Sequence, residues 1–177
     1  PPGRILAVRG FAVTKNSGPG VSPGAAPSAR IACKFGGSSL ASAGQMRKVR
    51  AILESNEQRL IIVPSAPGKR DASDTKITDL LYLCQHAASV GADFSESFGL
   101  IATRFTGIES ELGIEPRIMD HLEQFREALR EGVTADYAAS RGEHFSGLLL
   151  AAWLNADFVE PAECIVIDSN GLVDPQT

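Results

Sequence analysis

The fold of this chain is decided by the stretch Ala32-Cys33-Lys34-Phe35-Gly36-Gly37-Ser38-Ser39-Leu40. A short apolar strand is predicted from Arg30 to Lys34, and it ends in a glycine turn before a helix. Glycines let the backbone approach an anion closely, and successive N–H groups can form a nest around it. Lys34 adds a full positive charge, and the helix that follows adds its positive end. The stretch therefore predicts a phosphate site; the alternative is a tight turn with a solvated lysine.

The order of these residues excludes two common motifs. A Walker A loop requires G-x-x-x-x-G-K-[ST], whereas Lys34 precedes the glycines. A nucleophile elbow requires a glycine where this chain has Leu40. A phosphate site at this turn would therefore belong to a different class of nucleotide-using protein.

Strands and helices alternate after this stretch. A helix is predicted from Ser42 to Ser55, and the unbroken apolar run of the next strand, Arg59 to Val63, is typical of a parallel sheet covered on both faces. Pro64 should end that strand, because proline has no N–H to donate to a ladder. A polar loop from Ser65 to Lys76 then leads to a helix that starts near Thr78, with Thr78 as its N-cap.

The clearest periodicity predicts a helical hairpin. Apolar residues recur at alternating spacings of four and three from Phe94 to Leu112 and from Ile118 to Leu129, around a break at Gly113 to Pro116. A further helix is predicted from Thr134 to Leu154, and a last strand from Cys164 to Asp168. The turn signal Asn170-Gly171 follows that strand. This order of elements predicts an α/β sandwich with a mostly parallel sheet.

Residues 1–29 differ from the rest of the chain. They are rich in proline, glycine and serine and contain no acidic residue. We expect this extension to be mostly disordered, because it cannot bury enough apolar surface to offset the entropy of ordering. Its basic, acid-poor composition is also compatible with a transit peptide, which is the alternative interpretation.

Composition excludes several function classes. The net charge of −4 argues against non-specific binding of nucleic acid. No apolar run approaches the roughly 18 residues of a membrane span. The three cysteines, Cys33, Cys84 and Cys164, form no CxxC pair, which is typical of reduced, buried thiols in a cytoplasmic protein. The three histidines have no metal-ligand spacing, and no HExxH motif is present.

Two further patches could carry chemistry. Ser65 to Arg70 follows a strand, at the sheet edge where ligands of open α/β sheets bind; the alternative is a mobile basic loop. Ser140-Arg141-Gly142-Glu143 lies inside a predicted helix, where glycine costs about 1 kcal/mol relative to alanine and so suggests a close approach. Glu143 could hold an amine, or Arg141 and Glu143 could simply face solvent.

Together these patches resemble the aspartate kinase branch of the amino-acid kinase family, over residues 30–177. The matching stretches are Ala32 to Leu40, Pro64 to Arg70, Asp74-Thr75-Lys76-Ile77-Thr78-Asp79-Leu80-Leu81, Asp136 to Glu143, and Val166-Ile167-Asp168. Each motif alone would be only suggestive, but in this order they are specific.

The resemblance implies a fold and a reaction. The fold would be the three-layer αβα sandwich of the amino-acid kinase (carbamate kinase-like) fold, of which this chain holds the N-terminal lobe. The reaction would transfer the γ-phosphate of ATP, with Mg²⁺, to the side-chain carboxylate of L-aspartate. The product, 4-phospho-L-aspartate, begins lysine, threonine and methionine biosynthesis. The complete enzyme would be a cytoplasmic homo-oligomer that binds neither nucleic acid nor membranes.

The resemblance also implies roles for individual residues. The catalytic residue would be Lys34, in contact with the transferred phosphate. The residues lining the phosphate path would be Gly36, Gly37 and Ser38. The residues binding aspartate would be Ser65 and Thr78, with Glu143 pairing with the α-amine.

The sequence departs from the family pattern in two places. Pro64 stands where the family usually continues its strand, and the chain ends at Thr177, before a nucleotide-binding lobe and ACT domains. We therefore expect the chain alone not to phosphorylate aspartate. Two alternatives stay open: a non-catalytic half-lobe that acts as a binding module, and a sibling enzyme acting on another carboxylate such as acetylglutamate.

Overall fold

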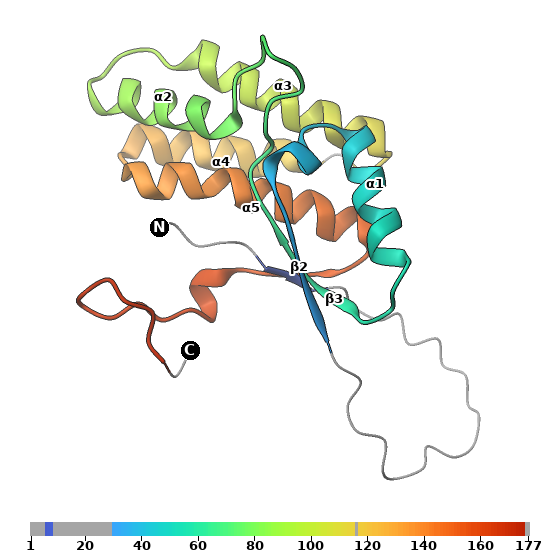
Figure 1. Ribbon diagram of the computed structural model, residues 1–177. Helices are drawn as coiled ribbons and strands as arrows, with labels where there is room; N and C mark the ends of the chain where they lie inside the picture. The colour runs from blue at the N-terminus through green and yellow to red at the C-terminus, as the bar shows by residue number, and fades with distance from the viewer. Residues whose placement is uncertain (1–5, 9–29, 116, 176–177) are drawn as a thin grey trace, which may run out of the picture.

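The computed structural model describes residues 6–8, 30–115 and 117–175 (Figure 1). In chain order its elements are β1 (Leu6–Val8), β2 (Ile31–Phe35), the 3-10 turn η1 (Gly37–Leu40), α1 (Ala43–Glu54), β3 (Arg59–Pro64), α2 (Ile77–Ser89), α3 (Ser95–Leu112), α4 (Ile118–Glu131), α5 (Ala135–Leu154), β4 (Asp157–Val159) and the 3-10 turn η2 (Pro161–Glu163). None of the helices in these ranges has the length and apolarity needed to cross a membrane.

The four strands form one sheet in the order β2-β3-β1-β4. The predicted parallel pair is present: β2 runs parallel to β3, with Lys34 opposite Val63 and Phe35 opposite Pro64. By contrast, β1 is antiparallel to both β3 and β4. The α/β class is confirmed, but the antiparallel pairs make the sheet more mixed than predicted.

Strand β1 corrects part of the expectation for residues 1–29. Leu6–Val8 lie inside the extension that was expected to be disordered, yet their backbone pairs with β3 on one side and with β4 on the other. A central strand position satisfies the N–H and C=O groups of an extended segment, which composition alone does not reveal. The other residues of that extension lie outside the described ranges.

The helix α1 begins and ends where the sequence predicts. Ser42 is its N-cap, and the Ser42 Oγ accepts a hydrogen bond of 3.3 Å from the Gln45 N–H. Met46, Val49 and Leu53 lie on one face at spacings of three and four, and all three are buried. This face holds α1 against β3 and α3.

The N-cap of α2 lies two residues earlier than predicted. Lys76, not Thr78, occupies the N-cap position, and its side chain makes no capping bond. Ile77 is fully buried, and its N–H donates to the Pro67 carbonyl at 3.4 Å, so packing of the preceding loop sets the helix start. Thr78 therefore lies in the first turn, where its side chain is free of a capping role.

The helices α3, α4 and α5 form the main core with α2 (Figure 1). The predicted hairpin is confirmed, and Gly113 ends α3 in the left-handed conformation at φ 68°. Phe145 of α5 packs edge-on against Phe105 and Phe125, with ring centroids 5.4 and 5.9 Å apart. Glu109, although charged, is buried because its Oε1 caps the start of α4 by accepting from the Ile118 N–H at 2.8 Å.

The predicted strand from Cys164 to Asp168 is wrong. This segment instead forms one arm of a small hairpin, in which the Asp168 N–H donates to Leu172 at 2.8 Å and Ile167 forms an isolated bridge with Val173. The predicted turn is present, with Gly171 at φ 78°. In the described ranges no strand of the sheet lies beside this arm, and its apolar side chains are exposed. The β propensity of these residues is therefore not enough to make them a strand of the sheet.

Candidate functional site

A pocket of about 460 Å³ opens at the edge of the sheet where β2 and β3 end. Because these strands are parallel, the turn after Phe35 and the loop after Pro64 leave the sheet at the same edge. The residues that line the pocket are Gly37, Ser38, Ser65, Ala66, Pro67, Gly68, Lys69, Lys76, Thr78 and Glu143. Five of the predicted site residues, Gly37, Ser38, Ser65, Thr78 and Glu143, are thus brought together.

The other two predicted residues lie next to this pocket and do not line it. Lys34 is exposed near the end of β2, and its Nζ is 3.7 Å from the point where a Cβ on Gly36 would lie. The ammonium group therefore lies beside the glycine turn, as the sequence predicts for a phosphate-binding lysine. Whether Lys34 and Gly36 contact a phosphate stays a prediction.

The glycine turn and the following loop are interlocked through backbone atoms. The Gly68 N–H donates to the Gly37 carbonyl at 2.8 Å. A Cβ on Gly37 would lie 2.8 Å from the Ala66 carbonyl oxygen, and a Cβ on Gly68 would lie 2.8 Å from the Gly37 carbonyl carbon. Neither glycine can carry a side chain without a backbone shift, so the floor of the pocket is fixed by their small size.

The glycine inside α5 also marks a close approach, as predicted. A Cβ on Gly142 would lie 2.6 Å from the Ala66 Cβ and 3.2 Å from the Leu81 Cδ1. The helix thereby comes close to the loop after β3, which places the neighbouring Glu143 in the pocket wall.

The charges around the pocket differ in sign from place to place. Glu143 on α5 is half-buried, whereas Lys69 and Lys76, at two positions of the loop from β3 to α2, are exposed at its rim. Ser65 and Thr78, both half-buried, add hydroxyl groups. This combination suits a small molecule that carries both an ammonium group and anionic groups.

Sequence reasoning gave no role to the two lysines. Lys69 lies in the matched stretch Pro64 to Arg70, but nothing in the sequence distinguishes it from the solvated Arg70. Lys76 lies in the matched stretch Asp74 to Leu81, and it reaches the pocket rim because it is the N-cap residue of α2.

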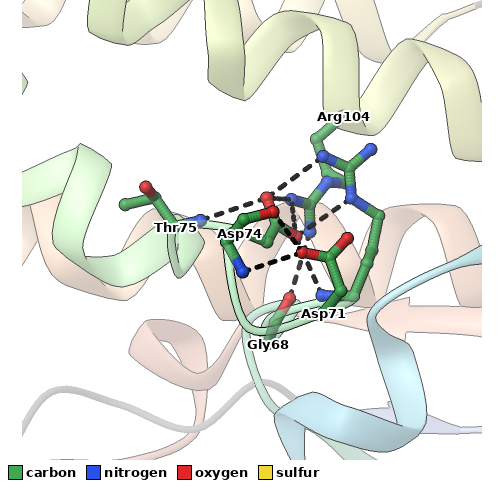
Figure 2. Close-up of polar contacts among 7 residues, drawn as sticks. Gly68, Asp71, Asp74, Thr75 and Arg104 are labelled. Atoms are coloured by element: carbon green, nitrogen blue, oxygen red, sulfur yellow. Dashed lines mark hydrogen bonds and ion pairs between the residues drawn. The ribbon is translucent and has the colours of Figure 1, made fainter.

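A buried ion pair behind the pocket was also missed. Arg104 of α3 donates to Asp74 at 2.6 Å and to the Gly68 carbonyl at 3.0 Å, and the Arg104 and Asp74 side chains are only 5% and 9% exposed (Figure 2). Arg104 lies three residues after the buried Ile101, on the apolar stripe of its helix. An arginine in such a stripe is almost never fully buried without a partner, and this is the signal that could have found the pair.

Hydrogen bonds and burial shift the pKa values of these groups. The pKa of Asp74 lies well below its usual range, chiefly because the Arg70 side chain donates hydrogen bonds to it. Burial lowers the pKa of Arg104, and the charge of Arg70 lowers it further. The charge of Asp74 and its hydrogen bond to Arg104 oppose this lowering, because both favour the protonated guanidinium group.

The motif Ser140 to Glu143 divides between two pockets. Glu143 lines the first, whereas Ser140 and Arg141 line a second pocket of about 380 Å³ with Glu160 and Ile165. Arg141 donates to the Ser140 Oγ at 3.0 Å and lies over the Tyr137 ring, 4.5 Å from its centroid. His144, next to Glu143, instead contacts Glu160 through Nδ1 at 2.7 Å, and burial lowers its pKa.

The cysteines and the possible metal ligands of the chain form no second candidate site in the described residues. Of the three cysteines predicted to be buried, only Cys84 is; Cys33 is half-buried and Cys164 is exposed. Burial raises the pKa of the Cys84 thiol to about 11, which keeps it protonated and unreactive. Across the described part of the chain, no three histidine, cysteine or acidic side chains gather in a way that could hold a metal ion.

Comparisons with known proteins agree with the pattern of motifs. A model of the amino acid kinase family matches residues 29–176. Aspartokinase 3 of Bacillus subtilis is 33% identical over 148 residues, covering 77% of this chain and 33% of that protein. Aspartokinase 1, chloroplastic, of Arabidopsis thaliana is 35% identical over 136 residues, covering 69% of this chain and 23% of that protein. The chain thus spans a third or less of these relatives.

Solved structures show the same likeness. Aspartate kinase of Clostridium acetobutylicum has a TM-score of 0.79 at 48% identity, over 81% of this chain and 33% of that one. Aspartokinase III of E. coli, solved in complex with aspartate and ADP, has a TM-score of 0.52 at 25% identity, over 69% of this chain and 28% of that one.

Proposed function

The chain belongs to the amino acid kinase family, and from this membership we propose that it forms the aspartate-binding part of an ATP-dependent aspartate kinase. The enzyme would transfer the γ-phosphate of ATP to the side-chain carboxylate of L-aspartate. The observation that carries the proposal is the pocket that joins Glu143 to a glycine turn and two lysines at one edge of the sheet.

The chemistry of this transfer matches the groups that the pocket provides. A carboxylate oxygen of aspartate attacks the γ-phosphorus, the new P–O bond forms, and the bond to the leaving ADP oxygen breaks. The nucleophile is already deprotonated at neutral pH, so no general base is required. The barrier comes from bringing two anions together, and fixed positive charges and N–H donors lower it. We assign this role to Lys34 and to the turn Gly36 to Ser38.

The ammonium group of aspartate needs a negative partner, and Glu143 is the acidic residue in the pocket wall. With the ammonium held at α5, the hydroxyl groups of Ser65 and Thr78 can hydrogen-bond the carboxylates of the substrate. The rim lysines Lys69 and Lys76 would attract both anionic substrates. Glu143 would thereby fix which end of aspartate faces the phosphate turn.

The complete enzyme would also require Mg²⁺, which ATP-dependent phosphoryl transfer uses. Mg²⁺ would enter on the phosphates of ATP; the described residues contain no cluster of ligands for it, so we assign no residue of this chain to the ion. We also propose that the product serves lysine, threonine and methionine biosynthesis, and that the enzyme is a cytoplasmic homo-oligomer.

The Glu143→Gln change tests the placement of the substrate. We define the completed enzyme as the Clostridium acetobutylicum aspartate kinase in which this chain replaces the matching third. Removing the charge of Glu143 should raise the KM for aspartate by about 10-fold or more, since hydrogen bonds to charged groups contribute about 1.5–3 kcal/mol. The KM for ATP should stay nearly constant, as measured by steady-state kinetics.

The matched control is Glu57→Gln, which removes a charge from the exposed turn between α1 and β3. It should change neither KM. A rise in the KM for ATP with an unchanged KM for aspartate in Glu143→Gln would show that the pocket holds the nucleotide instead.

A further inference from the structure

We propose that Arg104 is a positioning residue that fastens the pocket loop, residues 65–76, to α3 and thereby fixes the glycine turn. The inference rests on the proposed function, because it assigns Arg104 to the geometry of that transfer. Arg104 does not line the pocket and is not assigned a contact with substrate.

The guanidinium group holds the pocket loop at two separate points. Arg104 Nη1 donates to the Gly68 carbonyl at 3.0 Å, and Nη2 donates to the Asp74 carboxylate at 2.6 Å (Figure 2). These points lie six residues apart in the loop, and α3 lies outside it in sequence. The planar fork of arginine can bridge a carbonyl and a carboxylate, whereas the single ammonium of lysine cannot match that geometry.

The first of these points connects directly to the glycine turn. The Gly68 carbonyl accepts from Arg104, while the Gly68 N–H donates to the Gly37 carbonyl at 2.8 Å. Two consecutive hydrogen bonds therefore link α3 to the turn that is proposed to receive the phosphate. Because Gly37 and Gly68 are also in close backbone contact, a displacement of Gly68 must displace the turn.

The second point stabilises the far end of the pocket loop. The Asp74 carboxylate also accepts from the Thr75 N–H at 3.1 Å and from the Arg70 N–H at 2.8 Å. The next residue, Lys76, lies at the pocket rim and precedes α2. Arg104 thus fixes both the Ser65 to Lys69 side and the Lys76 side of the pocket.

Burial of this pair argues for a geometric role. A buried ion pair is a poor source of stability, because the loss of hydration offsets the attraction between the charges, and apolar residues of the same volume often serve as well. What an apolar side chain at Arg104 could not supply is the directional contact with the Gly68 carbonyl. Burial also lowers the pKa of Arg104, in agreement with a charge held away from water.

Arg70 provides a matched control for the same carboxylate. Its side chain is 54% exposed and also pairs with Asp74, at 3.0 Å. Unlike Arg104, Arg70 lies within the pocket loop itself, and its side chain bonds Asp74 and not the Gly68 carbonyl. Arg70→Met therefore removes one partner of Asp74 and leaves the contact between α3 and Gly68 in place.

The first experiment measures amide hydrogen exchange by NMR on the full 177-residue chain. In Arg104→Lys, the Gly68 amide should exchange about 10-fold faster or more, because its hydrogen bond to Gly37 opens locally. The exchange rates of the Leu149 and Leu150 amides in α5 should change by less than about 2-fold. In Arg70→Met, the exchange rate of the Gly68 amide should also change by less than about 2-fold. Equal Gly68 exchange in wild type and Arg104→Lys would overturn the inference.

The second experiment compares kinetics in the completed enzyme. Arg104→Lys should lower kcat by about 10-fold, since small misplacements of reacting groups have effects of this size or larger, while the KM for ATP stays within about 2-fold. Arg70→Met should retain kcat within about 2-fold. Faster Gly68 exchange with unchanged kcat would overturn the positioning role.

The exchange and kinetic measurements distinguish a failure of the proposed function from a failure of the role of Arg104. A completed wild-type enzyme without activity would reject the proposed function, whereas the exchange measurement would still decide whether Arg104 fastens the loop. If amides throughout the Arg104→Lys variant exchange faster, the variant is unfolding as a whole. The test then uses Asp74→Asn instead, which keeps the shape of the side chain. That change should also accelerate Gly68 exchange and lower kcat, and a result with neither effect would contradict the inference.

Discussion

The Lys34→Ala change is expected to lower kcat of the completed enzyme by about 100-fold or more, with little effect on folding. Lys34 is exposed at the end of β2 and supports no part of the core, so its removal leaves the structure intact. Its Nζ lies beside Gly36, where it can face an incoming phosphate. A positive charge fixed there stabilises the transferred group in the transition state more than in the ground state, so the loss should appear in kcat.

The measurement is steady-state formation of aspartyl hydroxamate, with thermal unfolding followed by circular dichroism. Lys48→Ala is the matched control, because Lys48 is an exposed lysine on α1 that does not line the pocket. It should retain full kcat. Near-normal turnover in Lys34→Ala would rule out its catalytic role.

The Gly37→Ala change is expected to have a comparable effect on kcat and, unlike Lys34→Ala, also to destabilise the fold. The added Cβ would lie 2.8 Å from the Ala66 carbonyl oxygen and 3.0 Å from the Gly68 nitrogen, both backbone atoms that cannot swing aside. Overpacking of this kind costs about 1–3 kcal/mol. Because the turn and the pocket loop must separate, kcat should fall by about 100-fold.

Gly107→Ala is the matched control for this change. Gly107 lies in α3 with open space around its missing Cβ, so alanine there should stabilise the helix by about 0.5–1 kcal/mol and leave kcat unchanged. If Gly37→Ala kept both its melting temperature and its kcat, the contact between the two backbones would have no part in the site.

Local patterns in the sequence were sufficient for most of the helices and for the parallel pair. Helices were predicted to begin near Ser42 and Thr134, and both side chains prove to accept N-cap hydrogen bonds. Thr78, which was predicted to cap a helix, does not cap it. Gly142 was predicted to mark a close approach, and Ala66 and Leu81 lie against it. Gly37 was predicted to let the backbone approach an anion, and in the structure its close neighbours are Ala66 and Gly68.

Features that depend on contacts distant in sequence could not be predicted. Arg104 and Asp74 are 30 residues apart, so nothing local shows that they pair. The pairing of Leu6–Val8 with β3 and β4 could not be predicted for the same reason, because both partner strands are distant in sequence. Conversely, a strand was wrongly predicted from Cys164 to Asp168. These residues have strand propensity but no neighbouring strand in the described ranges.

The central claim is that this chain supplies the aspartate-binding part of an aspartate kinase, and the most direct test is phosphorylation by the completed enzyme. ATP would be supplied with either L-aspartate or acetylglutamate, and acyl phosphate would be trapped as hydroxamate. We predict turnover with L-aspartate at least about 100-fold above the Lys34→Ala control and none above that control with acetylglutamate. A folded completed enzyme that binds ATP but gives no aspartyl hydroxamate above the control, or that prefers acetylglutamate, would contradict the claim.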